Sequence, residues 1–228
     1  NGGGGAIYIY NDLQIANKIK LTNLHFTTCK AVFGAAIFIY ASYEDVSILI
    51  DDCKFNSNEI YSLTSTPAFY GGSAIYLVAL NSVITQCIFR KNKGVGGSVK
   101  LLHNFDAKPP QNNHANILSN QRQMTIKSSE NSISITSCTF EIDENSECSL
   151  FYVNGKHSSK TNVKDCIFIG NLVKGAYHID VQSISNEKIN LNLQNCKFSS
   201  DSKSAVNSKS IKVNLKNQVF NYNKKLES

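Results

Sequence analysis

The seven residues Asp52-Cys53-Lys54-Phe55-Asn56-Ser57-Asn58 form a sequence motif that recurs along the chain. Near copies are Gln86-Cys87-Ile88-Phe89-Arg90-Lys91-Asn92 and Asp165-Cys166-Ile167-Phe168-Ile169-Gly170-Asn171. Looser copies contain Cys138 with Phe140 and Cys196 with Phe198, and the copies around Phe26 and Phe220 lack the cysteine. A motif repeated at intervals of roughly 25–50 residues indicates stacked supersecondary units rather than one irregular globule.

A second motif lies between copies of the first. In it, tiny residues precede a strand of alternating apolar residues. It opens the chain as Gly4-Gly5-Ala6-Ile7 and recurs as Gly34-Ala35-Ala36-Ile37 and Gly72-Ser73-Ala74-Ile75. A third segment, such as Val46-Ser47-Ile48-Leu49-Ile50 before Cys53, alternates apolar and polar residues. Such alternation is typical of a strand with one face buried and the other face in water. With a strand in each of the three segments, each repeat is predicted to contain three short strands.

When the repeats are aligned on the cysteine, several positions keep one residue type. A phenylalanine stands two residues after the cysteine, in a column of Phe26, Phe55, Phe89, Phe140, Phe168, Phe198 and Phe220. Three residues further on, an asparagine column contains Asn58, Asn92, Asn171 and Asn223, with Cys29, Asp143 and Asp201 as substitutes. Equivalent residues that stack in this way require parallel strands in register, about 4.8 Å apart.

Three strands per repeat, without a helix long enough to connect them, predict an all-β parallel β-helix (a β-solenoid) of about six to seven coils. Stacked phenylalanines fill its narrow interior. An asparagine or aspartate at a corner can adopt the left-handed conformation and satisfy buried corner amides with its side chain, and a column of them forms a hydrogen-bonded ladder. We expect a single domain over residues 1–228, as a fragment of a longer chain, with a corner-loop insertion at 102–131. Such insertions often form a binding face. A loop that only connects two strands, or a partly disordered segment, is the alternative.

The motif Phe-x-x-Asn combined with Gly-Gly-Ala-Ile resembles the repeat signature of the polymorphic membrane protein family, bacterial surface proteins with a β-helix of the pectate-lyase-like superfamily. The segments that begin at Phe55, Phe89, Phe168 and Phe220 match the first motif, and Gly4-Gly5-Ala6-Ile7 matches the second literally. The resemblance implies a right-handed parallel β-helix, an extracellular or cell-surface location, and a role in adhesion or display.

The net charge of +6 comes almost entirely from lysine, since arginine occurs only as Arg90 and Arg122. Apart from the doublet Lys224-Lys225, the lysines are scattered singly, whereas nucleic-acid binding favours clustered basic residues with aromatic residues on one face. We therefore expect solvated lysines and no nucleic-acid partner. No apolar run reaches the roughly 18 residues of a membrane helix, so the sequence predicts no transmembrane segment.

Five of the seven cysteines fall in one column, which contains Cys53, Cys87, Cys138, Cys166 and Cys196. Neighbouring thiols about 4.8 Å apart are compatible with disulfides. The column faces inward, however, and buried thiols pack as small hydrophobic groups, so we favour free thiols. The dispersed histidines and the lack of a Cys-x-x-Cys motif predict neither a metal site nor a cofactor.

Asp51 and Asp52 form the only acidic doublet at a predicted corner, and Arg90 lies at another corner. Many β-helices are polysaccharide lyases or hydrolases, which need several acids on one outer face, so these three residues are weak catalytic candidates. The equivalent positions hold Thr85-Gln86 and Lys164-Asp165, which favours an ordinary polar corner, and no acidic pair is evident beside Arg90.

Tyr8, Tyr10, Tyr40 and Tyr76 lie in or beside the strands that follow the tiny residues. On an outer face these rings would form an aromatic strip that can stack on sugars or on a partner protein. On an inner face they would pack in the hydrophobic core.

Packing explains the residue type that each column repeats, and no catalytic constellation is evident. The leading hypothesis is therefore a non-catalytic repeat module for adhesion, for binding a protein or glycan through corner loops, or for structural spacing. The alternatives are a polysaccharide lyase or glycoside hydrolase of the pectate-lyase-like group, and a structural protein that forms filaments by end-to-end self-association.

Overall fold

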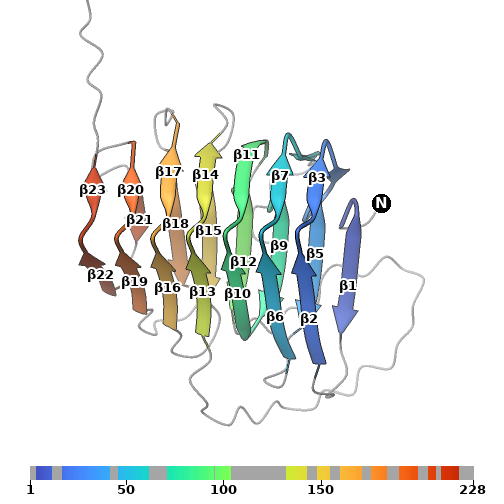
Figure 1. Cartoon of the computed structure of the whole chain (residues 1–228), viewed down its shortest axis with the longest axis horizontal. Helices are drawn as coiled ribbons and strands as arrows, with labels where there is room; N and C mark the ends of the chain where they lie inside the picture. The colour runs from blue at the N-terminus through green and yellow to red at the C-terminus, as the bar shows by residue number, and fades with distance from the viewer. Residues whose placement is uncertain are drawn as a thin grey trace, which may run out of the picture.

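The chain folds into stacked parallel β-coils. In the computed structural model, the described residues are 4–11, 17–41, 46–61, 71–94, 96–103, 132–142, 148–154, 160–170, 176–183, 190–199, 205–208 and 212–220. Within them lie three sheets of seven strands and one two-stranded sheet. Each coil contributes one strand to each large sheet, and the coils follow one another along the long axis of the molecule (Figure 1). The predicted parallel β-helix is confirmed, with seven coils in the described part.

The three large sheets are named A, B and C in the order in which the chain visits them. Sheet A contains β1 (Ile7–Asn11), β5 (Ile37–Ala41), β9 (Ile75–Ala79), β12 (Val99–His103), β15 (Cys148–Asn154), β18 (Tyr177–Ser183) and β21 (Val206–Ser208). Sheet B contains β2 (Asn17–Thr22), β6 (Val46–Asp51), β10 (Asn81–Thr85), β13 (Ser132–Thr136), β16 (Lys160–Lys164), β19 (Asn190–Gln194) and β22 (Lys212–Lys216). Sheet C contains β3 (His25–Thr27), β7 (Lys54–Asn56), β11 (Ile88–Asn92), β14 (Thr139–Ile142), β17 (Ile167–Ile169), β20 (Lys197–Phe198) and β23 (Val219–Phe220). The short pair is β4 (Lys30–Ala31) with β8 (Glu59–Ile60).

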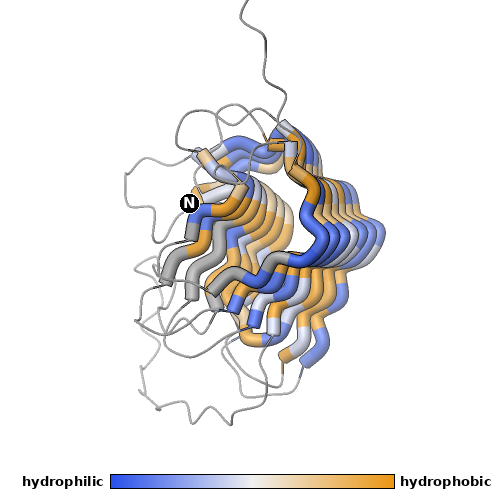
Figure 2. The backbone as a smooth tube through the Cα atoms, turned by 90° about the vertical axis from the view of Figure 1, so that its left-hand side faces the viewer, coloured by the Kyte–Doolittle hydropathy of each residue, from blue (hydrophilic) through white to orange (hydrophobic). Residues whose placement is uncertain are grey.

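The predicted columns are in register from coil to coil. In sheet B, Leu21 pairs with Ile50, Ile50 pairs with Ile84, and the same column continues to Leu215. Figure 2, which looks along the stack, shows similar hydropathy at equivalent positions of successive coils. Because side chains alternate between the two faces of a strand, a slip of one residue would turn a core column toward water. Burial of the columns therefore fixes the register.

The phenylalanine column forms a continuous stack through the interior. Consecutive ring centroids from Phe26 to Phe220 are 4.8–5.4 Å apart. The five inner rings, from Phe55 to Phe198, are at most 1% exposed. Aliphatic side chains from the inner faces of sheets A and B complete the core.

A residue in the left-handed conformation makes the corner between sheets B and C in every coil. These residues have φ angles of 48–55° and are Asn23, Asp52, Gln86, Ser137, Asp165, Asn195 and Asn217. Asparagine and aspartate adopt this conformation at a lower cost than most residues, which explains why they occupy most of these positions.

The predicted left-handed role of the asparagine column is wrong, because Ser57 and Lys91, one residue before Asn58 and Asn92, adopt that conformation. The predicted hydrogen-bonded ladder is confirmed at Asn58 and Asn92, which are both buried. Asn58 Oδ1 accepts a hydrogen bond from the Cys29 amide at 2.9 Å, and Asn92 Oδ1 accepts from the Asn58 amide at 3.0 Å. Their side chains thus satisfy amides that a turn would leave unpaired. The other members of this column, Asn171, Asn223, Asp143 and Asp201, lie outside the described residues.

The predicted insertion at 102–131 begins two residues later than expected, because Leu102 and His103 complete β12. Its remaining residues, 104–131, lie outside the described ranges. In the described part of the chain, no helix is long and apolar enough to cross a membrane.

Candidate functional site

The outer face of sheet A carries stacked aromatic rings. The centroids of Tyr8 and Phe38 are 4.8 Å apart, and those of Tyr10 and Tyr40 are 4.9 Å apart. Phe38 and Tyr40 are buried, whereas Tyr8 is 52% exposed. The tyrosines therefore line up on an outer face, as one of the two sequence hypotheses required, but most of this strip is a second apolar core.

Lys100 continues the same column after Tyr76 and is completely buried. Its Nζ lies 5.5 Å from the centroid of the Tyr76 ring, within the range of a cation–π interaction. Burial raises the pKa of the Tyr76 hydroxyl. Because Lys100 and Tyr76 are both buried, this part of sheet A offers little surface to a macromolecular partner.

The outer face of sheet B is accessible to solvent over its whole length. Its outward side chains, which we call the polar face, are half-buried or exposed wherever the structure describes them. Coil two contributes Ser47, Leu49 and Asp51 to this face, and the in-register residues of coil three are Asn81, Val83 and Thr85. The coils after these add mainly serine, threonine, asparagine, glutamine and lysine. A flat surface with repeating hydrogen-bonding groups is suited to binding rather than to enclosing a small molecule.

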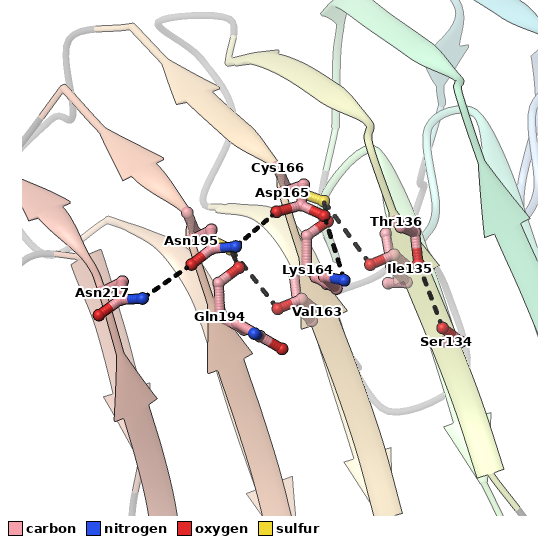
Figure 3. A network of polar contacts seen from close by, with 11 residues as sticks. Ser134, Ile135, Thr136, Val163, Lys164, Asp165, Cys166, Gln194, Asn195 and Asn217 are labelled. Atoms are coloured by element: carbon pink, nitrogen blue, oxygen red, sulfur yellow. Dashed lines mark hydrogen bonds and ion pairs between the residues drawn. The ribbon is translucent and has the colours of Figure 1, made fainter.

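Side-chain ladders hold the polar face in a defined arrangement. Asn192 Nδ2 donates to Asn162 Oδ1 at 3.0 Å, and Asn214 Nδ2 donates to Asn192 Oδ1 at 2.7 Å. A parallel ladder runs along the neighbouring corner (Figure 3), where Asn195 Nδ2 donates to Asp165 Oδ1 at 2.8 Å and Asn217 Nδ2 donates to Asn195 Oδ1 at 3.2 Å. Because these amides are already positioned, a ligand need not order them on binding.

The structure gives Asp51 and Asp52 ordinary structural surroundings. Asp52 is one of the left-handed corner residues, with a φ of 48°. Asp51 ends β6 and lies in register between Thr22 and Thr85. Among the described residues, no hydrogen bond or ion pair joins either aspartate to Arg90.

Arg90 projects from sheet C, and its Nε lies 3.5 Å from Oε2 of Glu141 on the next coil. Glu141 is a single acid that the register of coils three and four brings next to Arg90, and it does not make the acidic pair that a sugar-cleaving site requires. The Arg90 side chain is exposed and that of Glu141 is partly exposed, so this ion pair contributes little to stability. A catalytic role for Asp51, Asp52 or Arg90 stays a prediction.

All seven cysteines are free, and the five members of the column are buried. Each of these five Sγ atoms lies 3.1–3.4 Å from the carbonyl oxygen two residues earlier, to which the thiol donates. Hydrogen bonds to neighbouring thiols, together with burial, raise the pKa values of Cys53, Cys138 and Cys196. Within the described ranges, no group of three or more His, Cys, Asp or Glu residues could hold a metal ion.

His178 is a buried polar residue that the sequence interpretation did not single out. It occupies the column of tiny residues before the sheet A strands, and its ring centroid lies 5.8 Å from that of Phe168 and 6.0 Å from that of Phe198. Its Nδ1 lies 3.4 Å from Ser149 Oγ, and its Nε2 has no hydrogen-bond partner among the residues that the structure describes. Burial lowers its pKa to about 4, so the ring is neutral near pH 7. The signal in the sequence was a large polar residue where other repeats have alanine or serine.

Comparison of the chain with protein-family models, curated proteins and solved structures found no match. The class that the structure itself defines is a parallel β-helix with a long, accessible polar face. Similarity to polymorphic membrane proteins rests on the repeat motifs alone, and membership of the right-handed pectate-lyase-like superfamily stays a prediction.

Proposed function

We propose that this chain is a non-catalytic repeat module of an extracellular or cell-surface protein, which acts in adhesion or binding and also serves as a structural spacer. The observation that carries the proposal is the polar face, on which accessible hydrogen-bonding side chains recur in register over seven strands. Such a surface provides many weak contacts whose effects combine along an extended partner.

The surroundings of the catalytic candidates support a non-catalytic role. Asp52 has a structural role, because it forms the corner between sheets B and C, and the Arg90 side chain is paired with Glu141. Lyases and hydrolases of sugars need acids that act together on one bond. Among the described residues, the acid that projects from sheet B is Asp51, and its in-register neighbours are the hydroxyl residues Thr22 and Thr85.

The test is incubation of the protein with a panel of plant, algal and microbial polysaccharides, with and without calcium. Retention and the masses of any products are measured together. We expect retention without cleavage. Cleavage products that disappear in an Asp51→Asn/Asp52→Asn double variant would instead establish the enzymatic alternative. Light scattering at high protein concentration tests the filament alternative, which predicts a mass that grows with concentration.

A further inference from the structure

The lysines that are scattered in the sequence gather on the polar face in space. Lys18 and Lys20 project from β2 in coil one, Lys160 and Lys164 project from β16 in coil five, and Lys216 projects from β22 in coil seven. Four of these side chains are clearly exposed, and that of Lys164 is 48% exposed. Asp51 is the only acid among the described side chains of this face. The polar face is therefore strongly basic.

The polar face is also flat. From Phe26 to Phe198, consecutive rings of the internal stack differ in plane by only 4–8°. Successive coils are thus hardly rotated, whereas strands of an ordinary sheet rotate by about 20–25°. Seven strands at a spacing of about 4.8 Å give a plane about 29 Å long, and Figure 1 shows the strands running nearly parallel throughout.

Positive charge is concentrated toward both ends of this plane, and Asp51 is the one charged residue among the described side chains of the coils between them. Between the lysines of coil one and those of coil five lie Leu49 and the 40% exposed Val83, adjacent in the central column of the face. The corner beside the second lysine group holds Asp165, whose Oδ2 lies 3.7 Å from Lys164 Nζ. Even with this pair discounted, Lys18, Lys20, Lys160 and Lys216 leave an excess of positive charge.

We propose that the polar face docks on an anionic lipid bilayer, with its lysines at phosphate and carboxylate headgroups and with Leu49 and Val83 against the interface. This inference rests on the proposed binding function and names its partner. Charge complementarity and planarity both favour a membrane, since flexible lysine stems carry charge to a planar surface without needing a groove. Nucleic acid fits less well, because neither arginine nor an aromatic side chain is among the described groups of this face.

The test measures co-sedimentation of the protein with phosphatidylcholine vesicles that contain phosphatidylserine. Each lysine held near an anionic surface is worth about a five-fold change in binding, so two removed together lower it about 25-fold. We expect this loss both in Lys18→Gln/Lys20→Gln and in Lys160→Gln/Lys216→Gln. The control is Lys30→Gln/Lys93→Gln. Lys30 lies in β4, where it pairs with Glu59 at 2.7 Å, and Lys93 directly follows β11, so neither charge belongs to sheet B and their loss should change binding less than about two-fold. High salt should release the wild-type protein.

Several results would overturn the proposal. They are absence of binding, equal binding to vesicles of phosphatidylcholine alone, a loss in the control that matches the polar-face variants, and a loss at only one end of the face. Circular dichroism of each variant establishes that it is folded. The polysaccharide panel and a DNA duplex are tested with the same variants. If vesicles do not bind but a polysaccharide is retained, the membrane inference fails while the proposed binding function stands. If no ligand is retained, the binding function fails as well.

Discussion

Removal of one ring from the middle of the phenylalanine stack should destabilise the whole protein. Phe89 is completely buried, and its ring lies 4.9 Å from that of Phe55 and 4.8 Å from that of Phe140. A buried Phe→Ala substitution costs about 3–5 kcal/mol, through lost burial and the cavity that is left. Two stacked neighbours lose their contact with this ring, so the upper half of that range is expected for Phe89→Ala.

Phe220→Ala is the matched variant, because Phe220 is half-buried and stacks on Phe198 at the longer distance of 5.4 Å. Partial burial of one ring is worth about 1–2 kcal/mol. Urea unfolding followed by circular dichroism measures both variants, since the chain has no tryptophan to report by fluorescence. Equal losses in the two variants, or a loss below about 1 kcal/mol for Phe89→Ala, would refute the idea that the stack stabilises the coils.

Three further predictions concern buried polar groups. Asn92→Ala removes the acceptor of the Asn58 amide and should cost about 1–3 kcal/mol in urea unfolding, whereas a neutral result would show that the ladder is dispensable. Thiol titration should find about one reactive cysteine in the native protein, the partly exposed Cys29, and all seven after denaturation without reductant; fewer in the denatured protein would reveal disulfides. His178 has a pKa of about 4 in the fold against about 6.5 when unfolded, so the unfolded state binds the extra proton and stability falls as the pH drops from about 6.5 to 4. His178→Ala should remove that part of the slope, and an unchanged pH dependence of the unfolding midpoint would contradict the assignment.

The fold was predictable because packing is periodic in this chain. The columns of Phe55 and of Cys53 each repeat one side-chain type that is buried in coils two to six. The same environment is therefore visible several times in a single sequence. The corner conformation was placed wrongly by one residue, since Asn58 and Ser57 are both typical of turns and only the backbone shows which of them has a positive φ.

The candidate surface was less predictable, because it depends on which residues of different coils become neighbours. The ion pair of Arg90 with Glu141, and the shared column of Lys164 and Lys216, each bring together residues that are far apart in the chain. Inserted segments of unequal length separate the repeats, so sequence spacing does not show these contacts. The repeat columns give the register, and the register then brings the outward residues together.

The most direct test of the account is the distance between two points on the polar face. Thr22 and Gln194 occupy one column, five coil steps apart, and Lys216 continues it by one more step. Spin labels at Thr22→Cys/Gln194→Cys and at Thr22→Cys/Lys216→Cys, both in a Cys29→Ser background, report these separations by pulsed electron paramagnetic resonance. In-register parallel coils predict narrow distributions near about 24 Å and about 29 Å, which differ by one strand spacing. Broad distributions, or two distances that do not differ by about one strand spacing, would contradict the stacked, in-register face on which the proposed binding depends.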